Sequence, residues 1–396
     1  MENRCYNRLL KTVGFCFILV AIPCLLLVIN STKTGYRSMP FSSVASFRFG
    51  EDASGAEASG SRTMTCNEFG DNKICQYGTV RSGHKYAIYG STLFDQPRSE
   101  NYCFLLPLSA MAWNRIGYDS LIYIIGDHER CDNTSRIRFI VDALMAEDYV
   151  VLLVIEGIRQ NNSVTLGQVL RLFGASFVQK VDDPKTWQDT YIITADADIW
   201  PVNETFFDLP PGKDILHGDI SGNPEPDVNT PTNAPLSFVG MRVKTWIEVM
   251  SYFGLFAMPR TSKQLILYFD SVFGKSSCEG VLHGGQGWFI DQGMISRRIQ
   301  EWKIEKENGT KKIYIYNRMF MTDRIDRVRW HIDILEGIVD AHILEYAYTP
   351  ETWHFMRPLI KLLYPNNVTI SWCDDFADKM YQLNITCRSG IDNEIY

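Results

Sequence analysis

The 396-residue sequence predicts an α/β protein with a mostly parallel sheet that helices cover on both faces. Two observations predict this fold class. Short runs of apolar, β-favouring residues alternate with longer segments that have helical spacing. The runs are almost continuously apolar, as expected for strands that are buried on both faces. Because ligands bind at the carboxyl ends of the strands in such sheets, polar residues at these ends are the first candidates for a site.

The N-terminal segment predicts the compartment. Arg4, Arg8 and Lys11 precede an apolar run over residues 13–29, which is at the short end of the lengths that span a membrane. Positive charge on the N-terminal flank favours a cytoplasmic N-terminus. We expect a cytoplasmic tail over 1–12 and a transmembrane signal-anchor over 13–29. A cleaved signal peptide is the alternative.

The rest of the chain fits the lumen of the Golgi or the endoplasmic reticulum, which predicts a single-pass type II membrane protein. Residues 30–83 are rich in Ser, Gly, Thr and Ala and predict a stem, and 84–396 are expected to form the catalytic domain. The net charge of −7 argues against a nucleic-acid partner. Glycosylation sites indicate the secretory pathway, and they begin at Asn133, Asn161, Asn203, Asn308, Asn367 and Asn384.

The pattern from residue 84 onward predicts strands and helices in turn. The expected order is strand 86–89, helix 102–116, strand 120–125, helix 135–147, strand 149–155, helix 164–173 and strand 191–193. A proline-rich loop over 208–235 is then followed by strand 236–242, helices 244–253 and 261–273, a glycine-rich loop over 276–287, strand 313–316 and helix 353–363.

Asp196 and Asp198 directly follow the predicted strand 191–193. Two carboxylates next to a buried strand need a positive partner, because a desolvated charge is costly. Mn²⁺ or Mg²⁺ is the simplest such partner, since these ions take oxygen ligands and substrate phosphates. A solvated turn is the plain alternative. The motif resembles the Asp-x-Asp metal site of GT-A glycosyltransferases, in which the metal holds the diphosphate of a nucleotide-sugar.

Other polar residues fall at the carboxyl ends of the predicted strands. Gly90 and Ser91 end one strand, and Asp127 follows another. Together with Asp196 and Asp198 they predict a nucleotide site at one edge of the sheet.

A second constellation lies at Asp291-Gln292-Gly293, after the glycine-rich loop and at the start of a predicted helix. It resembles the Asp-Gln-Gly element of the glycogenin-like, retaining GT-A family, which implies that Asp291 and Gln292 act at the acceptor side of the donor sugar. The same resemblance implies that Arg171 lies near the donor. The chain departs from that family in lacking its C-terminal His-x-x-Gly-x-Lys-Pro. Asp291 is equally suited to cap the helix.

A third metal ligand is expected, and GT-A enzymes often use a C-terminal histidine. His331 is the first candidate because it follows the predicted strand 313–316 in a polar break. His283, in the glycine-rich loop, is the second candidate. A lone histidine is more often structural than a ligand.

These features predict a metal-dependent glycosyltransferase that uses a nucleotide-sugar donor, first a UDP-sugar, and a glycan, protein or lipid acceptor. Two other functions compete. An inactive, membrane-tethered glycan-binding protein with the same fold would not need both Asp196 and Asp198. A metal-dependent phosphodiesterase or nuclease would need more clustered His and Asp ligands than the seven scattered histidines supply.

Overall fold

The computed structural model describes one compact unit, which lies within Ser61–Tyr396. The predicted tail, the predicted span and the stem up to residue 64 lie outside the described residues. In the described part of the chain, no helix is long and apolar enough to cross a membrane. The described residues are 65–69, 72–93, 99–126, 135–158, 160–181, 187–219, 234, 236–251, 263, 266–267, 269, 289–317, 323–328, 330–332 and 335–391.

A nine-stranded sheet crosses the domain in the order β1-β2-β5-β4-β3-β6-β9-β8-β10 among the described residues. The strands are β1 (Thr65–Phe69), β2 (Asn72–Tyr77), β3 (Lys85–Thr92), β4 (Asp119–Ile125), β5 (Val150–Glu156), β6 (Tyr191–Thr194), β8 (Ile215–Asp219), β9 (Val239–Arg242) and β10 (Ile313–Asn317).

The centre of this sheet is parallel, but its outer parts are not. Strands β5, β4, β3 and β6 run parallel to one another, and so do β8 and β10. The pairs β1–β2, β2–β5, β6–β9 and β8–β9 are antiparallel. The prediction of a mostly parallel sheet is therefore correct for the centre and for the pair β8–β10, because an apolar run indicates a strand but not its direction.

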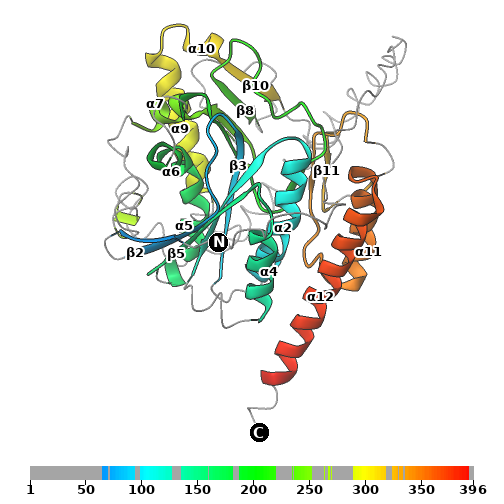
Figure 1. The fold of residues 1–396 in the computed structure, drawn as a ribbon. Helices are drawn as coiled ribbons and strands as arrows, with labels where there is room; N and C mark the ends of the chain where they lie inside the picture. The colour runs from blue at the N-terminus through cyan, green and yellow to red at the C-terminus, as the bar shows by residue number, and fades with distance from the viewer. Residues whose placement is uncertain are drawn as a thin grey trace, which may run out of the picture. The chain divides into compact units, whose positions relative to one another are not determined.

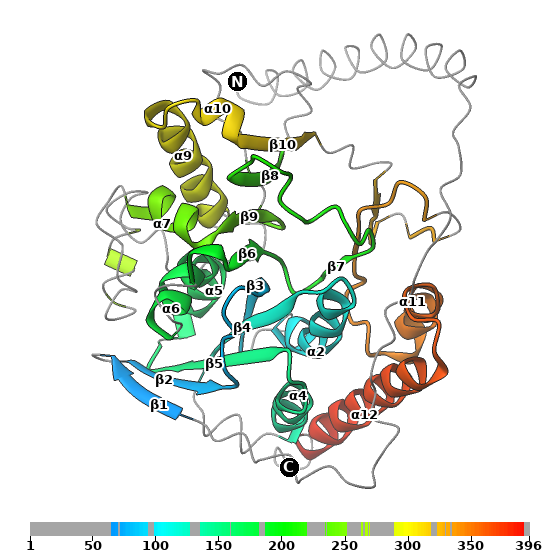
Figure 2. The same ribbon diagram turned by 45° about the horizontal axis from the view of Figure 1, so that its top comes forward.

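Helices cover both faces of the sheet, as the apolar strands predicted. Figures 1 and 2 show α5, α6, α7 and α9 on one side and α2, α4, α11 and α12 on the other. Alternate residues of β3 enter the two cores: Ile88 packs in one and Tyr89 in the other. The helices are α2 (Ser99–Arg115), α4 (Ser135–Met145), α5 (Gln160–Val169), α6 (Gly174–Val181), α7 (Val243–Ser251), α9 (Ile290–Glu305), α10 (Gly309–Lys312), α11 (Pro350–Leu363) and α12 (Asn367–Ile391), with 3-10 turns η1 (Leu170–Phe173) and η2 (Trp187–Asp189).

A second, three-stranded sheet lies beside the carboxyl end of β6. It consists of β11 (Arg324–Ile325), β12 (Asp340–His342) and β7 (Ile199–Pro201), in that order. Strand β7 follows the Asp-x-Asp motif directly, and it pairs with β12 in antiparallel fashion. The small sheet thus joins the motif to the C-terminal third of the chain.

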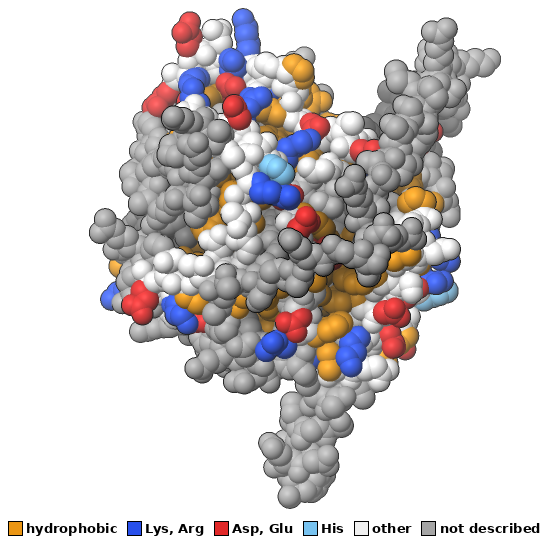
Figure 3. Space-filling view, in the orientation of Figure 1, with side chains coloured by type: hydrophobic (Ala, Val, Ile, Leu, Met, Phe, Trp, Pro, Cys, Tyr) orange, Lys and Arg blue, Asp and Glu red, His pale blue; other side chains and the backbone are white. Residues whose placement is uncertain are grey.

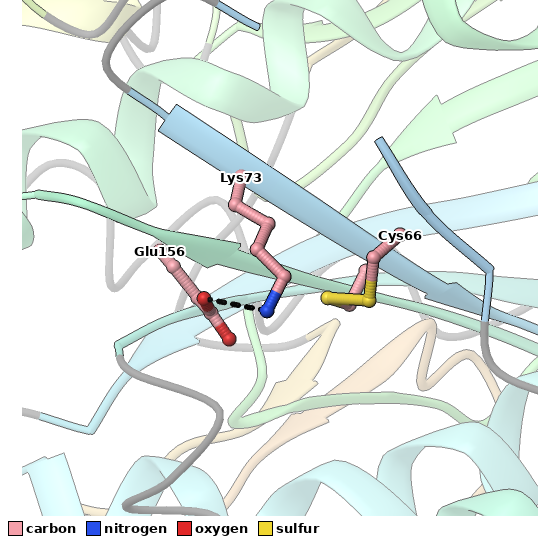
Figure 4. The surroundings of a disulfide bond; sticks show 4 residues. Cys66, Lys73 and Glu156 are labelled. Atoms are coloured by element: carbon pink, nitrogen blue, oxygen red, sulfur yellow. Dashed lines mark ion pairs between the residues drawn. A yellow bond between two sulfur atoms is a disulfide. The ribbon is translucent and has the colours of Figure 1, made fainter. Parts of the chain in front are cut away.

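The N-terminal hairpin β1–β2 extends the sheet into the segment that we assigned to the stem. Cys66 and Cys75 are cross-strand partners and form a disulfide. Next to it, Lys73 pairs with Glu156 of β5 at 3.2 Å (Figure 4). The folded part therefore begins before residue 84. The stem boundary was placed too late because these strands carry polar residues and no periodic apolar pattern.

Most predicted elements agree with the structure to within a few residues, but β1, β2, β7, β11, β12, α10 and α12 were not predicted. Three further differences concern segments that were predicted. The predicted helix 164–173 divides into α5 and η1, and α6 continues it. Strand β8 lies inside the segment 208–235, which was predicted to be loop throughout. Most of the predicted helix 261–273 and of the glycine-rich loop lies outside the described residues.

Candidate active site

The Asp-x-Asp motif lies where the central strand β6 leaves the large sheet. The backbone N–H of Ala195 still donates to Ile88 O of β3 at 2.9 Å, and the chain then turns into β7. Asp198 is buried, whereas the Asp196 side chain is 37% exposed. The two carboxylates therefore lie at the carboxyl edge of the parallel centre, as predicted, and in different surroundings.

Arg171 connects Asp196 to Asp291. Its Nη1 donates to Asp196 Oδ1 and, at 2.9 Å, to Ala195 O, and its Nη2 donates to Asp291 Oδ2 at 2.6 Å. Arg171 comes from η1 and Asp291 from α9, so two helical elements on one face of the sheet meet the motif here. Three residues that the sequence analysis assigned to the site are thus in direct contact.

Asp291 does not cap α9. The helix has Phe289 at its N-cap position, and Asp291 is the second helical residue. Its Oδ1 accepts from the backbone N–H of Gln292 at 2.7 Å. A carboxylate in the first turn of a helix is also stabilised by the helix dipole. The prediction that Asp291 is the N-cap residue is therefore wrong. Its main side-chain contact is the ion pair with Arg171.

Burial and charge act in opposite directions on this buried pair. Complete burial raises the pKa of Asp291, although the guanidinium of Arg171 opposes the shift. For Arg171, burial lowers the pKa, but the attraction of Asp196 and Asp291 exceeds that effect and leaves the pKa raised. Arg171 therefore remains positively charged between two carboxylates.

Asp198 faces a guanidinium and an imidazole. Its Oδ2 lies 3.2 Å from His342 Nε2 and 3.4 Å from Arg327 Nη1. Burial alone would raise the pKa of Asp198, but His342 and Arg327 hold the pKa below its ordinary value. Asp198 is therefore a buried carboxylate that is kept ionised by an imidazole and a guanidinium.

The pairing of β12 with β7 brings His342 to Asp198. His342 lies opposite Ile199 in the register, and the backbone N–H of Ile343 donates to Asp198 O at 2.8 Å. The sequence analysis missed His342 because its position depends on a strand of three residues. The alternation of apolar and polar residues over 339–343 was the available signal.

Further charged groups surround this part of the site. Asp326 Oδ2 lies 3.4 Å from His342 Nδ1, and Arg327 Nη1 lies 3.5 Å from Glu345 Oε1. Partial burial opposes the ionised form of Asp326, but the Val328 N–H and the charge of His342 hold its pKa below the ordinary value. On the face in Figure 3, basic, acidic and histidine side chains lie intermixed near the middle of the molecule.

The other predicted site residues have different surroundings or lie outside the described residues. His331 is exposed, and the histidine in contact with Asp198 is His342 instead. Ser91 is buried with its Oγ 3.2 Å from Cys103 Sγ. A Cβ at Gly90 would lie 3.0 Å from Tyr123 O and 3.2 Å from Gly167 O, so this glycine lets α5 pack closely on β3. Asp127 and His283 lie outside the described residues.

The residues at the motif fit a divalent cation by their chemistry. Carboxylates and an imidazole are ligands that Mn²⁺ accepts, and Asp198 and His342 converge within 3.2 Å. Within the described ranges, however, no three His, Cys, Asp or Glu side chains are grouped closely enough to form a complete metal site. Each carboxylate of the motif contacts a guanidinium instead, Asp196 that of Arg171 and Asp198 that of Arg327.

No protein-family model and no curated protein matches this chain. Among solved structures, the chain is similar to a mutant of a Drosophila β-1,4-galactosyltransferase 7 in complex with manganese, UDP-Gal and xylobiose. The sequence identity is 13% and the TM-score 0.30, and the similarity covers 67% of this chain and 73% of that chain. A TM-score this low supports no inference about function, which rests on the residues described above.

Proposed function

We propose that this chain is a metal-dependent glycosyltransferase of the GT-A type. It would move a sugar from a nucleotide-sugar donor, with UDP-sugars as the first candidates, to a glycan, protein or lipid acceptor. One observation carries the proposal: Asp196 and Asp198 leave a central parallel strand at its carboxyl end, and a second sheet adds the imidazole of His342 to them. This edge of an α/β sheet is where nucleotide ligands bind.

Different charged residues would hold the metal and the diphosphate of the donor. Asp196, Asp198 and His342 would hold Mn²⁺ or Mg²⁺, with His342 taking the role first assigned to His331. When bound, the metal would neutralise the diphosphate leaving group as a Lewis acid. Arg327 adds positive charge beside the motif, and guanidinium groups suit phosphate oxygens. The neighbouring Arg324 is buried in a two-bond ion pair with Asp340.

Asp291 and Gln292 would act on the other side of the motif. Asp291 fixes Arg171 next to Asp196, and the backbone N–H of Gln292 holds the Asp291 carboxylate in place. Both oxygens of Asp291 are bound in this way and its side chain is only 1% exposed, so Asp291 would act through Arg171, as a fixed support for Asp196. Gln292 is half-buried and lies in the first turn of α9, next to Asp291. There it would orient the acceptor or the sugar.

We further propose that the domain works in the lumen of the Golgi or the endoplasmic reticulum, anchored by residues 13–29. The disulfide Cys66–Cys75 supports this proposal because disulfides persist in oxidising compartments. Three glycosylation sites also lie on the surface, at Asn203, Asn308 and Asn367. Removal of N-glycans should increase the gel mobility of the expressed protein, and an unchanged mobility would contradict lumenal exposure.

The test of the activity is a panel of UDP- and GDP-sugars with Mn²⁺, in which release of the nucleoside diphosphate is measured without acceptor. We expect turnover with one donor and a loss by about two to three orders of magnitude in Asp198→Asn and Asp196→Asn. Asp374→Asn is the matched control, because Asp374 pairs with the exposed Arg357 between α11 and α12. Full activity in excess EDTA would contradict a metal-dependent enzyme.

The second candidate function is an inactive glycan-binding protein. The observation in its favour is that Arg171 and Arg327 already neutralise the two carboxylates of the motif. The same panel separates the two functions: an inactive protein would be stabilised by a sugar or a nucleotide in thermal unfolding without releasing any product.

A further inference from the structure

The middle residue of the Asp-x-Asp motif is held by a hydroxyl group from α2. Ser109 Oγ donates to Ala197 O, and it accepts from the indole N–H of Trp200 at 2.9 Å. We infer that Ser109 is a positioning residue, which fixes the backbone between the two carboxylates of the motif and thereby directs the side chain of Asp198. The part of this inference that concerns metal binding rests on the proposed function.

Ser109 lies in a part of α2 that is otherwise apolar. Every other residue from 104 to 113 is apolar, and all residues of this range are buried. A buried hydroxyl group is costly unless its hydrogen bonds are satisfied. Helix α2 packs on β7, the strand that follows the motif (Figure 2). The polar side chain in this apolar run therefore finds its partners in the motif and in β7.

The donor and acceptor roles decide where the proton of Ser109 points. An indole nitrogen only donates, so Ser109 accepts from Trp200, and its single proton is left for Ala197 O. This oxygen belongs to the same planar peptide unit as the backbone N–H of Asp198. A hydrogen bond to Ala197 O therefore restrains the orientation of the peptide from which the Asp198 side chain projects.

The carbonyl groups of residues 195–198 all accept hydrogen bonds, from donors in different parts of the chain. In chain order of the carbonyls, the donors are Arg171 Nη1, the Ile199 N–H, the Ser109 hydroxyl and the Ile343 N–H. Loss of the Ser109 hydroxyl would free Ala197 O, while the other carbonyls keep their partners. The effect should therefore centre on the peptide between Ala197 and Asp198.

Ser109→Ala is the first test, because it removes the hydroxyl with little change in volume and alanine suits a helix. We expect the affinity for Mn²⁺, measured from the free ion by electron paramagnetic resonance without nucleotide, to fall by about tenfold. Arg115→Met is the matched control. Arg115 also belongs to α2, and its Nη2 donates to Pro201 O and Val202 O, both at 2.8 Å, at the end of β7 and just after it.

The comparison of the two variants distinguishes positioning from general support by α2. Both variants remove hydrogen bonds between α2 and the segment around β7, so both should lower the melting temperature. Only Ser109→Ala frees a carbonyl within the motif, so Arg115→Met should bind Mn²⁺ as tightly as the wild type. An equal loss of affinity in both variants, or wild-type affinity in Ser109→Ala, would overturn the inference.

A second measurement does not depend on the metal. Alanine labelled with carbon-13 at its carbonyl, together with nitrogen-15 aspartate, gives a nuclear magnetic resonance signal for each Ala–Asp pair. Asp196→Asn and Asp198→Asn identify the two signals of the motif by removing them. In metal-free Ser109→Ala, the signal of the Ala197–Asp198 peptide should shift, and that of Ala195–Asp196 should shift less, because Arg171 still binds its carbonyl.

The spectra also keep the two proposals separate. Equal shifts of both signals, or no shift of either, would overturn the role of Ser109. If the wild type bound no Mn²⁺, the proposed metal site would fail, and the spectra would still decide whether Ser109 holds the turn of the motif.

Discussion

The two carboxylates of the Asp-x-Asp motif are only two residues apart, yet they belong to different regions. Asp196 joins a buried group with Arg171 and Asp291, whose side chains are 8% and 1% exposed. Asp198 joins a more open group with Arg327 and His342, whose side chains are 22% and 18% exposed. The first group is tied to the large sheet and α9, the second to the small sheet.

This difference indicates different roles. A buried ion pair is costly to rearrange, because each charge depends on its partner for solvation. Arg171 and Asp291 therefore form a fixed support for Asp196. Arg327 divides its Nη1 between Asp198 at 3.4 Å and Glu345 at 3.5 Å, distances too long for tight binding to either. The open group is the part of the site that can exchange a guanidinium for another cation.

The largest expected difference between the two regions is in stability. Arg171→Met leaves Asp291 buried without its cation and should lower the free energy of unfolding by about 3–5 kcal/mol. Arg327→Met removes a partner that is 22% exposed and leaves His342 beside Asp198, so the loss should be clearly smaller. Urea denaturation of both variants in EDTA measures the two values. Equal losses would show that the regions do not differ in the way described.

Removal of Arg327 should also change metal binding. Arg327 and the metal would compete for the same oxygen of Asp198, and a guanidinium and a divalent cation about 4 Å apart repel each other by about 2 kcal/mol at high dielectric. We expect Arg327→Gln to bind Mn²⁺ about 30-fold more tightly than the wild type. Arg357→Gln removes an exposed guanidinium on α11 and serves as the control. Weaker binding by Arg327→Gln would mean that Arg327 supports the site instead of competing for it.

The two carboxylates Asp198 and Asp291 should contribute to the pH dependence of stability with opposite sign. Asp198 has a folded pKa below its ordinary value of 3.8, so its contribution is present above pH 3.8 and is lost as the pH falls through the folded pKa. The pKa of Asp291 is raised above 3.8, so its contribution is full below pH 3.8 and is lost as the pH rises through the folded pKa.

Melting temperatures from about pH 3 to about pH 6 in EDTA test this contrast. The stability difference between the wild type and Asp198→Asn should shrink on acidification, and the difference between the wild type and Asp291→Asn should grow. The same sign for both variants would contradict the assignment of opposite shifts.

The smallest expected effect belongs to Glu345. Glu345→Gln removes the alternative partner of Arg327, so the guanidinium should stay closer to Asp198. We expect a change of less than about 0.5 kcal/mol in stability and about twofold weaker Mn²⁺ binding. A calorimetric titration with Mn²⁺ resolves such a change, and tighter binding would exclude Glu345 as the alternative partner.

The sequence predicted the buried region of the site better than the open one. Asp196 and Asp198 were predicted because they follow a strongly apolar strand. Arg171 and Asp291, the other members of the buried group, were predicted from the family resemblance. His342 and Arg327 reach Asp198 through β11 and β12, which have two and three residues, and the only periodic signal there is the short alternation over 339–343. His331 was preferred because a polar break was visible around it, whereas the pairing that selects His342 is a tertiary contact.

The same reasoning explains which parts of the fold were predicted. The parallel centre was predictable because its strands are buried on both faces and consist almost entirely of apolar residues. Strand β8 was hidden in a segment rich in proline, and the hairpin β1–β2 consists largely of polar residues cross-linked by Cys66 and Cys75. A pattern of hydrophobicity cannot reveal strands whose place is set by a neighbouring strand or a covalent bond.

The pairing of β12 with β7 has a consequence for biosynthesis. A ribosome that adds about 5–20 residues per second needs about 7–30 s to proceed from Asp198 to His342, which lies 144 positions later. For most of this interval the nascent chain has the motif but neither its histidine nor Arg327, which lies 129 positions after Asp198. The proposed cation site is therefore completed only after the C-terminal third has emerged and docked. A chain released early would have the Asp-x-Asp motif but not the histidine that completes the proposed cation site.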